Sequence, residues 1–148
     1  MNNNLLALKE MKNFTGTTIC RHLGISNSAY SQWENNIIPI PTRRLIDFSN
    51  LYNINIDYIL KLTSIKIWTQ NNSDVDLKQI GKNLLIVRQY LGLSLRELGS
   101  ALNYSFSALA SYERGEHLIQ SDILIGLCKM SNYSIDWILG RSKYEYLD

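Results

Sequence analysis

The sequence has few of the residues that cross-link small proteins or bind metals. Its 148 residues include only two cysteines and two histidines, and Cys20 and Cys128 lie far apart in apolar segments. A disulfide framework or a metal cluster needs several Cys or His residues at short spacing. We therefore expect two buried free thiols, a reducing cytoplasmic environment, and neither a metal nor another cofactor.

Long apolar runs and turn-forming residues are scarce as well. No segment approaches the roughly 20 apolar residues that cross a bilayer, and the N-terminus does not have the pattern of a signal peptide. We therefore expect no membrane partner. Pro39 and Pro41 are the only prolines, and no hairpin-turn dipeptide separates alternating segments. Together with helical periodicity, these absences favour an all-α fold.

The chain also has little charge of either sign. Charged residues make up 19% of it, and the formal net charge is only +2. Residues 1–62 hold six basic and four acidic groups, and residues 77–148 hold eight and seven. Such a balance permits nucleic-acid binding without arguing for it, and any affinity should be moderate and sensitive to salt.

The sequence repeats itself at an offset of 79 residues. Residues 4–60 (copy one) match residues 83–139 (copy two) without a gap, with 16 identities. This match indicates two modules of about 60 residues, each with its own small core. We expect four segments: a first domain over residues 1–63, a linker over 64–76, a second domain over 77–140 and a tail over 141–148. Ile65, Ile67 and Trp68 should pack on something despite their place in the linker.

Each copy should form five short helices. Ser94 and Glu97 predict a capping box at the start of the second helix of copy two. Gly24 and Asn103, at the same place in the two copies, suit the left-handed residue that ends a helix. Residues 26 and 105 are both serine and should cap the third helix. The fourth helix should span residues 42–52 and 121–131, and the fifth residues 56–62 and 135–140.

The two copies resemble the Cro/phage-repressor type of helix-turn-helix domain, the lambda-repressor-like fold. The resemblance is carried by "FTGTTICRHLGISNSAYSQWENN" with "IDYILK" in copy one, and by "LSLRELGSALNYSFSALASYERG" with "IDWILG" in copy two. It implies a glutamate that pairs with a basic residue of the first helix, which here would join Lys9 to Glu34 and Arg88 to Glu113. The family often begins its second helix with a DNA-contacting Gln, but Gly16 and Leu95 stand there instead.

The resemblance places the outward face of the third helix in the major groove of double-stranded DNA. In copy one the candidate base-reading residues are Asn27, Ser28, Ser31 and Gln32, and the candidate phosphate contacts are Thr15, Thr17, Arg21, Arg43 and Arg44. In copy two the DNA-facing residues are Phe106, Ser107, Ala110 and Ser111, and the candidate phosphate contacts are Lys82, Arg96, Arg114 and His117. The face of copy two has no long polar side chain, so it could equally mark a protein contact.

These features favour a sequence-specific DNA-binding transcriptional regulator, a repressor rather than an activator, and not an enzyme. The alternative is a protein-interaction module, an antirepressor or adaptor, in which the second domain serves self-association or partner binding. A homodimer is possible, and no small-molecule ligand is suggested. The operator and the regulated genes are not encoded in such patterns.

Overall fold

The computed structural model describes residues 2–147. It divides the chain into two compact units, residues 1–71 (module 1) and residues 72–148 (module 2). Among the described residues it has ten helices and no extended strand. Module 1 contains α1 (Leu5–Met11), α2 (Gly16–Leu23), α3 (Asn27–Glu34), α4 (Thr42–Tyr52) and α5 (Ile56–Ile59). Module 2 contains α6 (Leu77–Leu91), α7 (Leu95–Leu102), α8 (Phe106–Glu113), α9 (Ser121–Ser131) and α10 (Ile135–Ile138). The all-α tandem expected from the sequence is confirmed.

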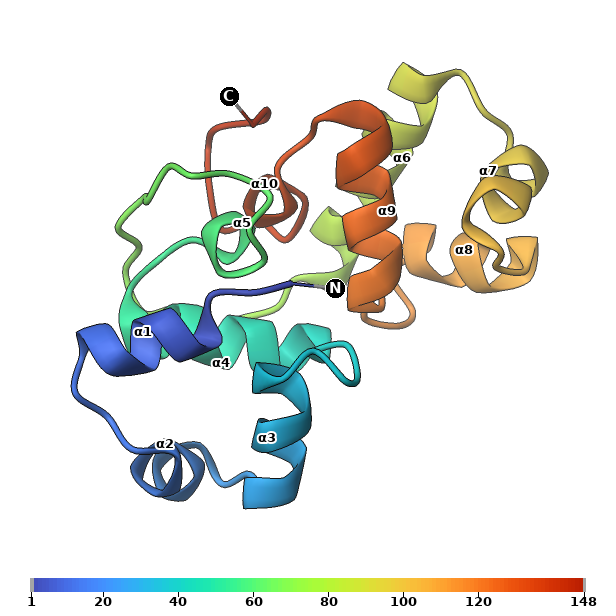
Figure 1. Cartoon of the computed structure of the whole chain (residues 1–148). Coiled ribbons are helices and arrows are strands. Elements are labelled where there is room, and N and C mark those ends of the chain that lie inside the picture. Colours follow the sequence, from blue (N-terminus) through green and yellow to red (C-terminus); the bar gives the residue numbers. More distant parts are fainter. Residues whose placement is uncertain (1, 148) are drawn as a thin grey trace. The chain divides into compact units, whose positions relative to one another are not determined.

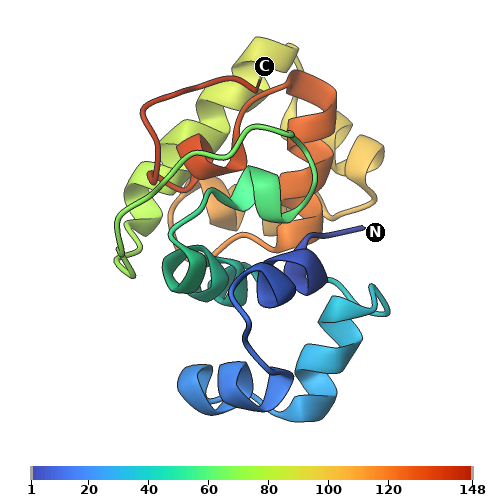
Figure 2. The ribbon, with the colours of Figure 1, turned by 60° about the vertical axis from the view of Figure 1, so that its left-hand side comes forward.

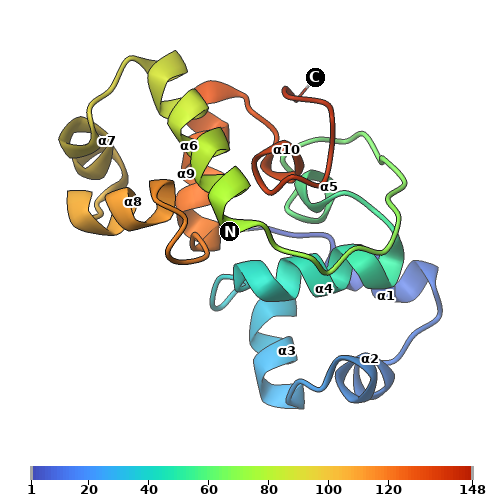
Figure 3. The same cartoon turned by 180° about the vertical axis from the view of Figure 1, so that it is seen from behind.

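Within each module, two helices form a support and two others form a corner at one end. In module 1, α1 and α4 lie side by side, and α2 with α3 projects away from α5 (Figures 1 and 2). In module 2, α6 and α9 hold the same places, with α7 and α8 at the end far from α10 (Figures 1 and 3). The corner is the part of each module that presents a free helix to a partner.

Each module has its own apolar core. In module 1, Leu5, Phe48 and Ile56 have no exposed surface, and in module 2 the same holds for Val87 and Ile135. Complete burial of a side chain of this size stabilises the fold by about 1.5–3 kcal/mol relative to its exposure. The support helices are therefore held rigidly beneath the corner.

An asparagine repeated at the offset of 79 residues joins the first helix of each module to the fifth. The Nδ2 atom of Asn4 donates to the carbonyl oxygen of Tyr58 at 2.7 Å. The Nδ2 atom of Asn83 donates to the carbonyl oxygens of Trp137 and Ile138 at 3.2 and 3.1 Å. Two of the repeated residues thus satisfy the end of the short fifth helix.

The segment after the fifth helix returns along its own module as a strap (residues 65–69 in module 1 and 144–147 in module 2). Ile54 forms an isolated antiparallel bridge with Trp68, and Tyr133 forms one with Tyr146. Residues 65–69 lie within the segment expected to be a linker, and Ile67 is half-buried as part of module 1. The repeated unit is therefore longer than the gapless match.

Candidate nucleic-acid interface

The corner of module 1 is shaped by side-chain caps and a left-handed turn. The Oγ1 atom of Thr15 accepts a hydrogen bond from the backbone amide of Thr18 at 3.1 Å, which starts α2. Gly24 ends α2 at a φ of 67°. Ser26 then accepts a bond from the amide of Ala29 at 3.0 Å and starts α3. The left-handed residue and the serine cap predicted from the sequence are both confirmed.

The inner face of α3 is held by aromatic packing. Tyr30 and Trp33 are buried, and their rings lie 5.9 and 6.2 Å from the ring of Phe48 on α4. Burial raises the pKa of the Tyr30 phenol, and the neighbouring Glu34 carboxylate raises it further. Tyr30 therefore stays neutral and serves as a core residue, which leaves the opposite face of α3 for a partner.

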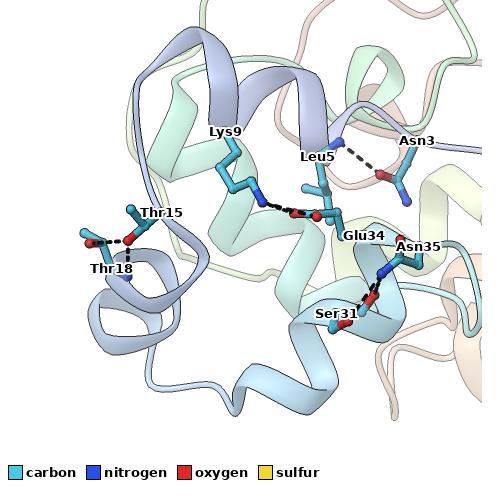
Figure 4. Close-up of polar contacts among 8 residues, drawn as sticks. All are labelled: Asn3, Leu5, Lys9, Thr15, Thr18, Ser31, Glu34 and Asn35. Carbon is cyan, nitrogen blue, oxygen red and sulfur yellow. Dashed lines mark hydrogen bonds and ion pairs between the residues drawn. The ribbon is translucent and has the colours of Figure 1, made fainter.

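Polar contacts fix the C-terminal end of α3 to α1. The Nζ atom of Lys9 lies 2.9 Å from Glu34 Oε2, and both side chains are mostly buried (Figure 4). Asn3 adds a second tie, since its Nδ2 atom donates to the carbonyl oxygen of Trp33 at 2.9 Å. Its Oδ1 atom also accepts from the amide of Leu5 at 2.9 Å. The orientation of α3 is thus set from behind by α1.

The outer face of α3 is polar. Asn27, Ser28 and Ser31 are exposed, and Gln32 is half-buried. Just past the helix, Asn35 Nδ2 donates to the carbonyl oxygen of Ser31 at 2.9 Å and to its Oγ atom at 3.3 Å (Figure 4). The four candidate base-reading residues therefore belong to one helix, and one of them is hydrogen-bonded to its neighbour.

The candidate phosphate contacts of module 1 differ in how far they are already bound. Thr17, Arg21 and Arg43 are exposed. Arg44 is partly engaged, because its Nη1 atom donates to the carbonyl oxygen of Leu23 at 3.2 Å and pairs with Asp47 at 3.0 Å. Its other guanidinium N–H groups are additional donors. The exposed basic groups of the α2–α3 corner are thus carried by α2 and by the start of α4.

The corner of module 2 is built in the same way from different residues. Ser94 and Glu97 form the expected capping box at the start of α7. Asn103 ends that helix at a φ of 59°. Arg88 binds Glu113 twice, and these hydrogen bonds raise the pKa of the guanidinium. The scaffold of the two corners is therefore equivalent, with an asparagine in place of the glycine.

The outer face of α8 differs from that of α3. Phe106 is 43% exposed, and the guanidinium carbon of Arg96 on α7 lies 4.3 Å from its ring centroid. Ser111 donates its hydroxyl proton to the carbonyl oxygen of Ala108 at 2.7 Å, inside the helix. Ala110 has no polar side chain. The face is therefore aromatic and cationic at one end and largely apolar along its length.

The flanks of this face are less basic than those of module 1. Arg114 pairs with Glu116 at 2.9 Å, while Lys82 and His117 are exposed. Asp122 occupies the place of Arg43 at the offset of 79 residues. The hydroxyl of Tyr104 lies 2.5 Å from the Asp122 carboxylate, and this hydrogen bond, with some burial, raises the pKa of the phenol to about 12.

Several of these residues escaped the sequence analysis. The change from Arg43 to Asp122 could have been found from the repeat, because it reverses the charge at one aligned position. Asn3 and Asn35 could not, because an asparagine beside a helix end is equally common as an ordinary turn residue. Only their side-chain hydrogen bonds distinguish them.

The corners have no feature of a metal or membrane site. No cluster of three His, Cys, Asp or Glu residues suited to a metal ion occurs among residues 2–147. Within the same range, none of the helices combines the length and the apolar character needed to cross a bilayer. What the corners offer instead is a polar helix in module 1 and an apolar one in module 2.

Comparison with known proteins agrees with this geometry. Residues 2–65 match the family described as "Helix-turn-helix domain", and residues 84–138 match the family described as "Helix-turn-helix". No curated protein matches the chain. The crystal structure of the clp gene regulator ClgR from Corynebacterium glutamicum is similar at 28% identity and a TM-score of 0.40, covering 46% of this chain and 72% of that one. The two family matches fall on the two corners, and the chain therefore belongs to the Cro/repressor type of helix-turn-helix regulator and carries two such DNA-binding domains in tandem.

Proposed function

We propose that module 1 reads a specific sequence of double-stranded DNA through the outer face of α3. The observation that carries this proposal is the division of α3 into two faces. Tyr30 and Trp33 fix it to the core, and the Lys9–Glu34 pair fixes its end. Because the support is rigid, the polar face enters a major groove already ordered, at little entropic cost.

The side chains on this face suit base recognition. Asn27 and Gln32 carry amides, which bind the N6 and N7 atoms of adenine in pairs, and Ser28 and Ser31 offer hydroxyls. Thr15, Thr17, Arg21, Arg43 and Arg44 surround the face and would hold phosphates. With few positive charges available, phosphate contacts alone would bind weakly, so base contacts must supply much of the affinity.

The regulatory outcome we propose is repression, by a non-enzymatic mechanism. A protein that covers a promoter blocks other proteins from it, whereas an activator also needs a surface for the transcription machinery. A reporter placed behind the selected DNA site should be expressed less when the chain is present. Increased expression would contradict repression while leaving DNA binding intact.

DNA binding is tested by selecting sites from a random duplex pool with the full chain, followed by gel-shift measurement. The double substitution Asn27→Ala/Gln32→Ala should weaken binding to the selected site by about 10-fold or more, since each bidentate base contact contributes about 1–3 kcal/mol. Asn71→Ala/Gln70→Ala is the matched control, because it removes the same exposed side chains outside the corner. Unchanged binding by the α3 variant would contradict the assignment.

For module 2 we propose self-association with a second copy of the chain through the outer face of α8. Phe106 supplies an exposed apolar centre. Arg96 stacks on it, and Asp122 follows at the adjacent start of α9. A surface that holds both a cation and an anion beside an apolar group is complementary to itself, as a two-fold interface requires. The carboxylate would also repel DNA phosphates.

Light scattering of the full chain tests this role. Arg96→Glu and Asp122→Arg should each shift the chain toward monomer by placing like charges together, and the double variant should recover the dimer. Arginine at position 122 is compatible with the fold, because module 1 has Arg43 there. A monomeric wild-type chain would contradict self-association, and loss of DNA binding without a change of mass would show that module 2 contacts DNA.

A further inference from the structure

The contact between Asn35 and Ser31 has a fixed direction. A backbone carbonyl oxygen can only accept, so the amide atom of Asn35 that faces the Ser31 carbonyl at 2.9 Å is its nitrogen. The same nitrogen lies 3.3 Å from Ser31 Oγ (Figure 4). An amide nitrogen donates and does not accept. The Ser31 hydroxyl is therefore the acceptor in this pair, and its own proton remains available.

The proton of Ser31 is directed away from the protein. Among the hydrogen bonds found for residues 2–147, none uses Ser31 Oγ as the donor, whereas Ser111 gives its proton to the carbonyl oxygen of Ala108. Ser31 is exposed on the outer face of α3. A hydroxyl oxygen that already accepts one hydrogen bond is polarised, which makes it a better donor and a poorer acceptor for the next.

On the basis of the DNA-binding function proposed for α3, we propose that Asn35 sets the base preference of Ser31 by making it a donor toward the major groove. Guanine offers N7 and O6 there, adenine offers N7 and thymine offers O4, all of which accept. Cytosine offers only its N4 amino group, which donates. Ser31 therefore discriminates against cytosine on the strand that it contacts, and Asn35 is the positioning residue for this choice.

The test is a comparison of base preferences among variants of the full chain, measured by competition between duplexes that differ at one base pair. The position contacted by Ser31 is the one whose preference disappears in Ser31→Ala. At that position the wild-type chain should disfavour cytosine by about two- to tenfold, the range expected of one hydrogen bond. Asn35→Ala should remove this preference, because the freed hydroxyl can bond within the helix as serine commonly does.

A double substitution shows whether Asn35 acts through Ser31. In Ser31→Ala/Asn35→Ala, the preference should equal that of Ser31→Ala alone. Ser28→Ala is the matched control, since it removes another exposed serine of the same face, and Asn35→Ala should keep its full effect in that background. An effect of Asn35→Ala that persists without Ser31, or a wild-type preference for cytosine, would overturn the proposal. A wild-type chain that selects no sequence would overturn the DNA-binding function itself.

Discussion

Arg88 and Glu113 are joined by two hydrogen bonds, from Nε to Oε2 at 2.7 Å and from Nη2 to Oε1 at 3.0 Å. Lys9 and Glu34 occupy the equivalent places in module 1, where a single ammonium group faces the carboxylate. Arg88 also donates to the carbonyl oxygen of Leu93 at 3.0 Å, beyond the end of α6. One guanidinium in module 2 therefore ties the recognition-like helix and the loop before α7 to the first helix.

Removal of this guanidinium should be costly. Arg88→Ala leaves Glu113 mostly buried and without its cation, a loss of about 3 kcal/mol at the lower end of the range for a broken buried pair. Arg88→Lys keeps the charge but not the two parallel bonds, so it should lose less. Urea unfolding of the full chain, followed by circular dichroism, measures both. Equal stability of Arg88→Ala and wild type would show that the pair does not hold α8.

Stability at acid pH should depend on the capping box of α7. Hydrogen bonds from Ser94 lower the pKa of Glu97. A carboxylate whose pKa is lower in the folded than in the unfolded chain stabilises the fold above its unfolded pKa, and this contribution disappears as pH falls through the folded pKa. Glu97→Gln should keep the cap but lose this part of the pH dependence.

The two modules provide a control for the cap itself. Ser94→Ala and Thr15→Ala each remove a side-chain cap and should each cost about 1 kcal/mol. Only the first should also change the acid dependence, because Thr18 stands in module 1 where module 2 has Glu97. Identical acid profiles for Glu97→Gln and wild type would contradict a role of the ionised carboxylate.

The scaffold of both corners was predictable from sequence because its determinants are local. Gly24 and Asn103 meet one backbone requirement at one place in the repeat, and Ser26 and Ser105 cap the helix that follows. The straps were not delimited, because their register with the rest of the module differs between the copies. Trp68 bridges Ile54, but its counterpart Tyr146 lies 78 residues later rather than 79, so a gapless comparison ends before it.

The site was less predictable because its determinants are contacts between side chains. The sequence indicates that Arg44 is basic, but not that Leu23 and Asp47 already engage it. It indicates that Ser31 faces outward, but not that Asn35 decides which partner it prefers. Such directions depend on atoms separated by turns of helix and by loops, which residue patterns do not specify.

Alkaline pH should destabilise module 2 through Tyr104. The hydrogen bond to Asp122 raises the pKa of this phenol to about 12, above the ordinary value of about 10. The stabilising contribution is complete below pH 10 and is lost as pH rises toward 12, because the unfolded chain releases the proton first. Asp122→Asn should lower the Tyr104 pKa, and difference absorbance of tyrosinate against the wild type measures this. An unchanged titration would contradict the hydrogen bond.

Transfer of the outer face of α3 to α8 should give module 2 the base preference of module 1. Phe106→Asn, Ala110→Ser and Ser111→Gln place the candidate base-reading residues on a helix already held by Arg88 and Glu113. Asp122→Arg adds the basic group that module 1 has in Arg43. Selection from random DNA should then recover the module 1 site twice in one duplex, with affinity above that for a single site because the second contact is intramolecular. The same variant with Asp122 retained should gain less, since the carboxylate repels phosphates. If the fourfold variant recovers one site only, the face of α3 is not sufficient for recognition.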